Sequence, residues 1–136
     1  MKTRILNARQ LGQAAELIKS GEVVAFPTET VYGLGANALD ASAVRKIFRA
    51  KGRPSDNPLI VHIADKKMMD ILARRTRKQE RVVELVTRRF WPGPLTIILR
   101  KTETVPVEVT GGLNTVAIRM PRDGVALGTG SPPSRG

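Results

Sequence analysis

Hydrophobic residues along the chain follow two spacings in turn, one typical of helices and the other of strands. Residues 8–20 carry apolar side chains at helical spacing and predict an amphipathic helix. Residues 22–27 are rich in Val and predict a short strand. A second helix is expected after Asp40, which is placed to cap it. Residues 59–63 are apolar at nearly every position, which predicts a strand buried on both faces.

The second half of the chain continues this alternation. A helical region with a basic surface is expected over residues 65–90, followed by a rigid WPGP turn at 91–94. Strands are expected at 95–99 and 115–120, separated by a loop at 102–114. Strands that alternate with helices predict an α/β or α+β fold, with a twisted mixed β-sheet flanked by helices. The length of 136 residues limits this fold to a single domain.

The last residues follow neither spacing. Residues 122–136 read RDGVALGTGSPPSRG, and their Gly, Ser and Pro content predicts a flexible tail. A sheet protein that ended just after a strand would expose a pairing edge. We therefore expect a folded domain at residues 1–121 that is incomplete at its C-terminus, and a chain that is truncated or frame-shifted.

Charge narrows the range of functions. The chain has 23 Lys and Arg against 12 Asp and Glu, a formal net charge of +11, which predicts a polyanionic partner or substrate. One Trp, one Tyr and three Phe are too few for a base-stacking platform, so phosphate is a better candidate ligand than bases. The favoured interpretation of the basic run in residues 66–89 is a solvated helix face. Contact with nucleic acid is the alternative, and it is the more specific functional hypothesis.

Several classes of site are excluded or disfavoured. There is no cysteine, and hence no disulfide framework or thiolate nucleophile. No phosphate loop of the Walker type, serine-nucleophile elbow or paired-His spacing occurs, and no metal site is predicted. No apolar run approaches the roughly 18 residues that cross a bilayer. We expect a cytoplasmic protein without a membrane partner.

Two loops carry most of the candidate chemistry. The segment PTETVYGLG, at 27–35, combines hydroxyl groups with glycines that permit close approach of a ligand, but an ordinary turn is equally compatible with it. In KGRPSDNP, at 51–58, Lys51 and Arg53 can converge on one phosphate chain. A solvated helix end would be favoured for an isolated pair of this kind. The prolines of the segment argue for a fixed loop instead.

The expected strands carry three further polar residues. His62 is the only histidine, and on its own it is better interpreted as a core or strand-end residue than as a catalytic one. Thr115 and Arg119 are four residues apart and should share one face of their strand. Because Arg119 lies among apolar residues, it requires an anionic partner from the protein or from a ligand.

The blocks PTETVYGLG, KGRPSDNPLIVHI, FWPGPLTIIL and TVAIRMP occur in this order, and together they resemble the YrdC domain family of threonylcarbamoyl-AMP synthases. The resemblance covers about residues 21–121 and implies a YrdC-like fold. The implied enzyme is a nucleotidyltransferase that condenses L-threonine, bicarbonate and ATP, with magnesium, into threonylcarbamoyl-AMP and pyrophosphate. Other proteins would then transfer the threonylcarbamoyl group to tRNA. Under the alternative that the basic surface contacts nucleic acid, its expected partner is tRNA or double-stranded RNA.

The resemblance also implies roles for individual residues. Threonine would be bound by Thr30, His62 and Arg119. ATP would be bound by Lys51, Arg53, Asn57 and Thr115, with Lys51 and Arg53 also catalytic. The family continues after the RMP strand into a loop of roughly SANxSG, which residues 122–136 do not match. A noncatalytic or degenerate YrdC-like RNA-binding module therefore remains an alternative.

Overall fold

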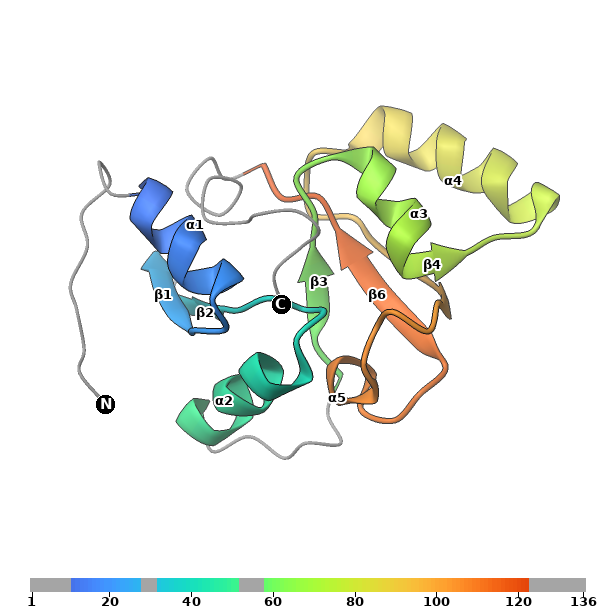
Figure 1. The fold of residues 1–136 in the computed structure, drawn as a ribbon. Coiled ribbons are helices and arrows are strands. Elements are labelled where there is room, and N and C mark those ends of the chain that lie inside the picture. The colour runs from blue at the N-terminus through green and yellow to red at the C-terminus, as the bar shows by residue number, and fades with distance from the viewer. Residues whose placement is uncertain (1–10, 28–31, 52–57, 123–136) are drawn as a thin grey trace.

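The computed structural model of the chain describes residues 11–27, 32–51 and 58–122, and its main feature is a four-stranded sheet. The strand order is β3 (Ile60–His62), β6 (Thr115–Arg119), β5 (Thr96–Lys101) and β4 (Ala73–Arg74). The β3–β6 pair is parallel, and the β6–β5 and β5–β4 pairs are antiparallel. The predicted mixed sheet is therefore confirmed (Figure 1).

A separate two-stranded sheet lies on one side of the molecule, next to the first helix. Strand β1 (Val24–Pro27) pairs antiparallel with β2 (Tyr32–Gly35), and α1 (Leu11–Lys19) lies beside them (Figure 1). Helix α1 and strand β1 confirm two predicted elements. Strand β2 was not predicted, because its two glycines favour a turn. Pairing with β1 overrides this local preference.

The region expected to be helical over residues 65–90 is interrupted, which corrects that prediction. It contains the short 3₁₀ helix η2 (Lys66–Met68), α3 (Met69–Leu72), strand β4 and α4 (Arg77–Phe90). Residues 74–81 are all polar, so the hydrophobic pattern does not mark the break, and pairing of β4 with β5 holds the two residues of β4 extended. Thr76 then begins α4 with a reciprocal capping box, in which it exchanges hydrogen bonds with Gln79.

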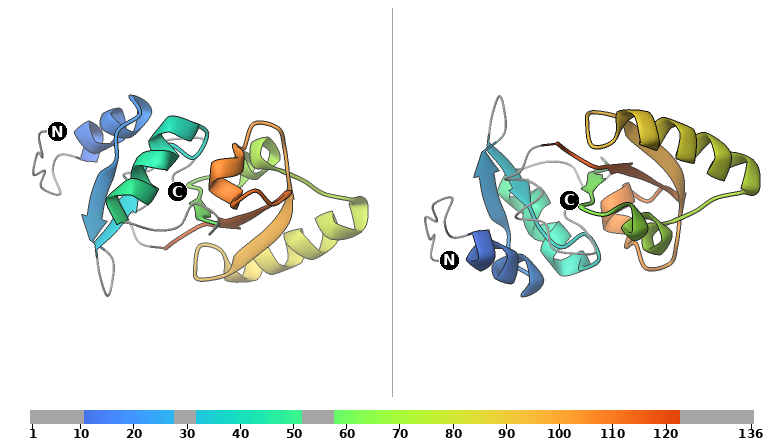
Figure 2. Two further views of the ribbon diagram at one scale, coloured as in Figure 1. Left: turned by 90° about the horizontal axis from the view of Figure 1, so that it is seen from below. Right: turned by 90° about the horizontal axis from the view of Figure 1, so that it is seen from above.

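Helix α2 (Ala41–Lys51) connects the two halves of the molecule. Asp40 caps it, as predicted, by accepting hydrogen bonds from the backbone N–H groups of Ser42 at 3.0 Å and Ala43 at 3.2 Å. One face of α2 packs into a small cluster at β1–β2, and another packs into the main core beside α5 (Val107–Thr110), a short helix in the predicted loop (Figure 2). The small cluster contains Ala36, Ala43 and Ile47, and α2 contributes Val44 and Phe48 to the main core.

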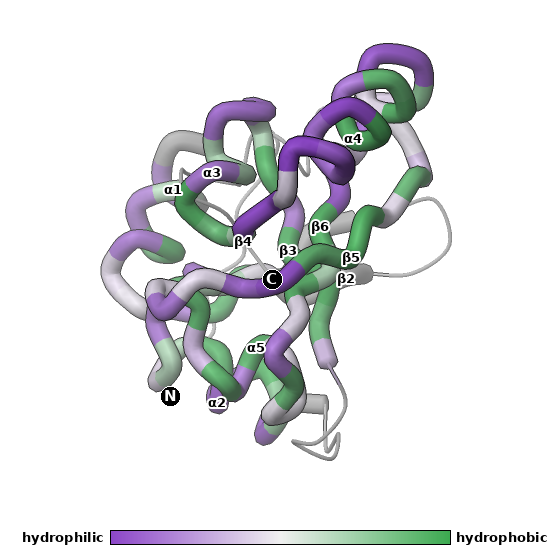
Figure 3. The backbone as a smooth tube through the Cα atoms, turned by 90° about the vertical axis from the view of Figure 1, so that its right-hand side faces the viewer, coloured by the Kyte–Doolittle hydropathy of each residue, from purple (hydrophilic) through white to green (hydrophobic). Residues whose placement is uncertain are grey.

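The main core covers only one face of the four-stranded sheet. Val61, Val116 and Ile118 are almost fully buried and pack with residues of α3 and α4. On the opposite face, Ile60 is 36% exposed and Ile98 is 66% exposed. The prediction that residues 59–63 are buried on both faces is therefore wrong, because α3, α4 and α5 contribute to a core on one side of the sheet. Figure 3 shows the apolar stretches of β3, β5 and β6 and the hydrophilic turns of α4.

The predicted WPGP turn fastens the end of α4 to the end of β6. The indole Nε1 of Trp91 donates to the carbonyl of Leu95 at 2.8 Å, and the Trp91–Pro92 peptide is cis. The backbone N–H of Gly93 donates to the carbonyl of Met120 at 2.8 Å.

Among the described ranges, no helix is long and apolar enough to span a bilayer.

The turn predicts a specific steric requirement at Gly93. A Cβ atom at this position would lie 2.5 Å from the backbone oxygen of Phe90, a distance that real contacts do not reach. We expect Gly93→Ala to lower the free energy of unfolding by about 1–3 kcal/mol, because backbone atoms must shift to relieve the overlap. Urea denaturation of both proteins measures this difference, and an unchanged midpoint would contradict the observed close approach.

Candidate functional site

Three polar side chains form a row across the open face of the four-stranded sheet. Arg119 on the central strand β6 is the register partner of His62 on β3 and of Thr96 on β5. Neighbouring strands lie about 4.8 Å apart, so the row is about 10 Å wide. The burial of β6 alternates, with Val116 and Ile118 facing the core. This alternation confirms that Thr115 and Arg119 share the other face.

The guanidinium of Arg119 is held by a neutral side chain. Its Nε and Nη2 atoms donate hydrogen bonds to Oγ1 of Thr96, at 3.1 Å and 2.9 Å. No carboxylate forms an ion pair with Arg119 within the described parts of the chain. The sequence predicted an anionic partner from the protein or from a ligand. The described residues supply a hydroxyl group, so the cation can still accept an anion.

Two further rows lie beside this one on the same face. The neighbouring row contains the apolar residues Ile60, Ala117 and Ile98. The row beyond it, toward the start of β6, contains Thr115 opposite Arg100. Thr115 and Arg119 are therefore separated by about 13 Å along the strand. The open face thus offers polar groups at both ends and an apolar surface between them.

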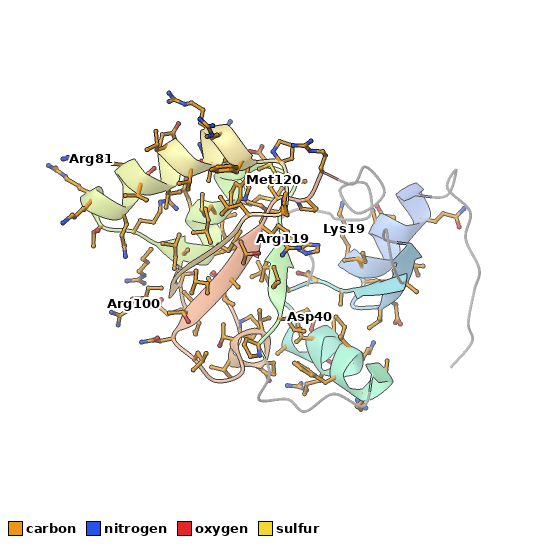
Figure 4. All side chains as sticks on the ribbon, turned by 180° about the vertical axis from the view of Figure 1, so that it is seen from behind. Lys19, Asp40, Arg81, Arg100, Arg119 and Met120 are labelled. Carbon is orange, nitrogen blue, oxygen red and sulfur yellow. The ribbon has the colours of Figure 1, made fainter. Side chains whose placement is uncertain are left out.

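The side chains show which cations face inward (Figure 4). Arg119 points from β6 toward the side where α1 and the β1–β2 sheet lie, whereas Arg81 and Arg100 point outward into solvent. Arg119 is also half-buried, in contrast to the exposed Arg81 and Arg100. Of these three arginines, Arg119 has the most enclosed surroundings for a small anionic ligand.

Only part of the predicted site can be compared with the structure. His62, Thr115 and Arg119 are brought to one face, which was predicted for Thr115 and Arg119 from strand periodicity. Thr30, Arg53 and Asn57 lie outside the described residues, and Lys51 is described only as the last residue of α2. The roles of all of these residues stay predictions.

Thr96 was missed by sequence reasoning. It lies in the predicted strand LTIIL, and only the antiparallel register of β5 with β6 brings it opposite Arg119. A sequence signal does exist, because a hydroxyl residue at the start of one strand can pair with an arginine at the end of its antiparallel neighbour. Using that signal would have required knowledge of the register.

A second candidate surface is the outer face of α4. Successive residues of an α-helix are rotated by about 100° around its axis. By this geometry, five cations of α4 lie on one side of the helix, and its two carboxylates lie on the flank nearer the core. Both carboxylates are paired, Glu80 with Arg75 and Glu84 with Lys66 and Arg88. Several outer cations have no acidic partner among the residues described: Arg77, Lys78, Arg81 and Arg89.

The ion pairs of this region shift two pKa values. Burial alone would lower the pKa of Arg75, but hydrogen bonds to Glu80 and Asp70 outweigh it and raise that pKa above its ordinary value. The hydrogen bond from Lys66, together with that from Arg88, holds the pKa of Glu84 below the ordinary glutamate value. Glu84 therefore links η2 to α4 in its charged form.

Within the described segments, no group of three or more His, Asp or Glu side chains lies close enough together to hold a metal ion.

Comparison with known proteins identifies the family. A family model described as Sua5_yciO_yrdC, telomere recombination, matches residues 16–128. The chain belongs to this family. It is 53% identical over 131 residues to a threonylcarbamoyl-AMP synthase of Pyrococcus abyssi, and 56% identical over 122 residues to one of Bacillus subtilis. These alignments cover 92% and 89% of this chain.

A solved structure of the Sua5/YciO/YrdC family is also similar. The crystal structure of P. abyssi Sua5 complexed with L-threonine superposes with a TM-score of 0.82 at 52% identity, over 93% of this chain. The chain spans 38% and 34% of the two synthases and 36% of the Sua5 chain. The similarity to Sua5 confirms the YrdC-like fold predicted from the four sequence blocks.

The lowered pKa of Glu84 predicts a pH-dependent contribution to stability. Because the folded pKa lies below the unfolded one, the contribution is fully present above the unfolded value, about 4.3. It is lost as the pH falls through the folded pKa. We expect Glu84→Gln to be less stable than the wild type at pH 7 and to lose less stability on acidification. Denaturant unfolding from pH 7 to pH 3 measures this difference, with substitution of the exposed Glu16 of α1 by Gln as the control. Parallel profiles for Glu84→Gln and the wild type would contradict the prediction.

Proposed function

We propose that this chain carries the substrate-binding part of a threonylcarbamoyl-AMP synthase acting in the cytoplasm. The reaction condenses L-threonine, bicarbonate and ATP and releases pyrophosphate. Other proteins would then transfer the threonylcarbamoyl group to tRNA. Membership of the family and the names of its relatives support this proposal.

The observation that carries the proposal is that Arg119 has no acidic partner among the described residues. Its half-buried guanidinium donates to a neutral hydroxyl, which leaves an electrostatic preference for an anion. The carboxylate of an amino acid matches its planar donors, and His62 lies beside it. The similarity to Sua5 complexed with L-threonine makes threonine the preferred ligand.

The distribution of polar rows supports a ligand with two polar ends. Threonine at Arg119 would leave Thr115, about 13 Å along β6, to contact the nucleotide. Arg100 is the register partner of Thr115 at that end, and its side chain points outward into solvent (Figure 4). We expect the carbamoyl-phosphate bridge of the product to run between the two ends, over the row that contains Ala117.

In the proposed mechanism the protein mainly orients two anions. The amine of threonine captures bicarbonate as a carbamate, with loss of water. A carbamate oxygen then forms a bond to the α-phosphorus of ATP as the bond to the pyrophosphate breaks. Arg119 would hold the carboxylate, and Lys51 and Arg53 would neutralise charge that develops on the phosphates. In this assignment Thr30 contacts threonine and Asn57 the nucleotide.

Magnesium is expected to arrive with ATP. In sites of this kind the ion is held mainly by phosphate oxygens and water, with few protein ligands. It would supply further charge neutralisation at the phosphates. The described residues gather no cluster of three acidic or imidazole groups that would hold it alone.

The proposed function can be tested through Arg119. We expect the folded chain to release pyrophosphate from ATP only when threonine and bicarbonate are present. Arg119→Ala should raise the KM for threonine at least about tenfold, because a charge-assisted hydrogen bond is lost. Arg81→Ala on α4 is the matched control and should leave this KM unchanged. Absence of threonine-dependent release from the folded wild-type chain would contradict the proposal, as would an unaltered KM in Arg119→Ala.

We also propose that the outer face of α4 contacts the phosphates of RNA. The supporting observation is the separation of charge on this helix, where the carboxylates are paired along one flank and four cations of the outer side have no acidic partner among the described residues. Arg77 and Lys78 lie in the first turn, where the helix dipole disfavours cations. Their placement is therefore not explained by helix stability, and an RNA backbone would compensate their charge.

This contact predicts a change in salt dependence. For single-stranded RNA, each lost phosphate contact should reduce the slope of log K against log salt by about 0.7. Lys78→Gln/Arg81→Gln should therefore reduce the slope by about 1.4. Lys19→Gln/Arg49→Gln removes the same charge from α1 and α2 and is the control. Fluorescence anisotropy with a labelled RNA measures both slopes, and equal reductions would indicate a diffuse charge effect in place of an α4 contact.

A further inference from the structure

The contact between Arg119 and Thr96 determines which edge of the guanidinium is available. Arginine has five N–H donors arranged in one plane. The donors on Nε and Nη2 that point to Thr96 form one edge of this plane. One donor of Nη1 and the remaining donor of Nη2 form a second edge. This edge also presents a parallel pair of N–H groups that can bind a carboxylate in a bidentate manner, and it is the edge that Thr96 leaves available.

Thr96 is well suited to fix this orientation. It lies on β5 as the direct register partner of Arg119, so the sheet sets the distance between the two side chains. Threonine is also stiff at χ1, because two heavy atoms branch from its Cβ. The hydroxyl accepts both hydrogen bonds, and its own proton has no acceptor among the described residues. That proton is therefore available to a ligand bound at the second edge.

Resting on the function proposed above, we propose that Thr96 is a positioning residue for threonine binding. It turns the Nη1/Nη2 edge of Arg119 toward the substrate carboxylate and restricts the side chain before the substrate arrives. Preorganisation of this kind lowers the entropic cost of binding. The inference assigns a role to a residue on β5, whereas the predicted threonine ligands lie in the segment PTETVYGLG and on β3 and β6.

Two substitutions separate the hydroxyl group from the shape of the side chain. Thr96→Val keeps the branched shape and removes the acceptor, whereas Thr96→Ser keeps the acceptor. We expect Thr96→Val to weaken threonine binding about tenfold, as loss of a hydrogen bond to a charged group would. Thr96→Ser should restore binding to within about threefold. Isothermal titration of the full 136-residue chain with L-threonine measures both values.

A spectroscopic measurement tests the orientation itself, without substrate. The Nε–H resonance of Arg119 is identified by its loss in Arg119→Lys. In the wild type and in Thr96→Ser this proton should exchange slowly with water, and in Thr96→Val it should exchange fast. Thr104→Val is the matched control, because it removes an exposed hydroxyl that donates to the carbonyl of Ile71, just beyond the end of β5 opposite to Thr96. It should alter neither binding nor exchange.

The outcomes distinguish this inference from the proposed function. Wild-type threonine affinity in Thr96→Val, or an unchanged Arg119 resonance in that variant, would overturn the role of Thr96 and leave the proposed function intact. Equal weakening in Thr96→Ser and Thr96→Val would also overturn it, since the acceptor would then be irrelevant. Failure of the wild-type chain to bind threonine would contradict the proposed function, and this inference with it.

Discussion

The register of β6 is the constraint on which the rest of the structure depends. Side chains along a strand alternate between faces, so a shift by one residue would turn Val116 and Ile118 out of the core and Arg119 into it. The strand is fixed from both sides, by parallel pairing with β3 and antiparallel pairing with β5. The same pairing that buries the core therefore brings His62 and Thr96 to the two sides of Arg119. Fold and candidate site share one cause.

Much of the fold could be predicted from the sequence because several elements follow a single periodic pattern. Helix α2 with its Asp40 cap and strand β6 with its alternating burial are examples. The failures occurred where pairing between strands overrides local preference. Strand β2 contains two glycines and forms because β1 pairs with it, and β4 interrupts the region predicted to be helical because β5 pairs with it.

The candidate site was predictable to the extent that its residues are recognisable by type and order. His62 is unremarkable by spacing alone, and only the family resemblance singled it out. Thr115 and Arg119 followed from strand periodicity. Thr96 did not, because a threonine near the start of a strand is common, and its importance depends on which residue lies opposite. Burial on one face of β3 was also missed, since a run of apolar residues does not reveal which side helices will cover.

The choice of a hydroxyl group to hold Arg119 has an electrostatic consequence. A carboxylate at the position of Thr96 would orient the guanidinium equally well, but it would also neutralise it, and any incoming anion would then have to displace or share that partner. A neutral acceptor fixes direction without consuming charge. Among the described residues, the sheet therefore orients Arg119 without neutralising it. The guanidinium is thus oriented before an anion binds, and its positive charge remains available to that anion.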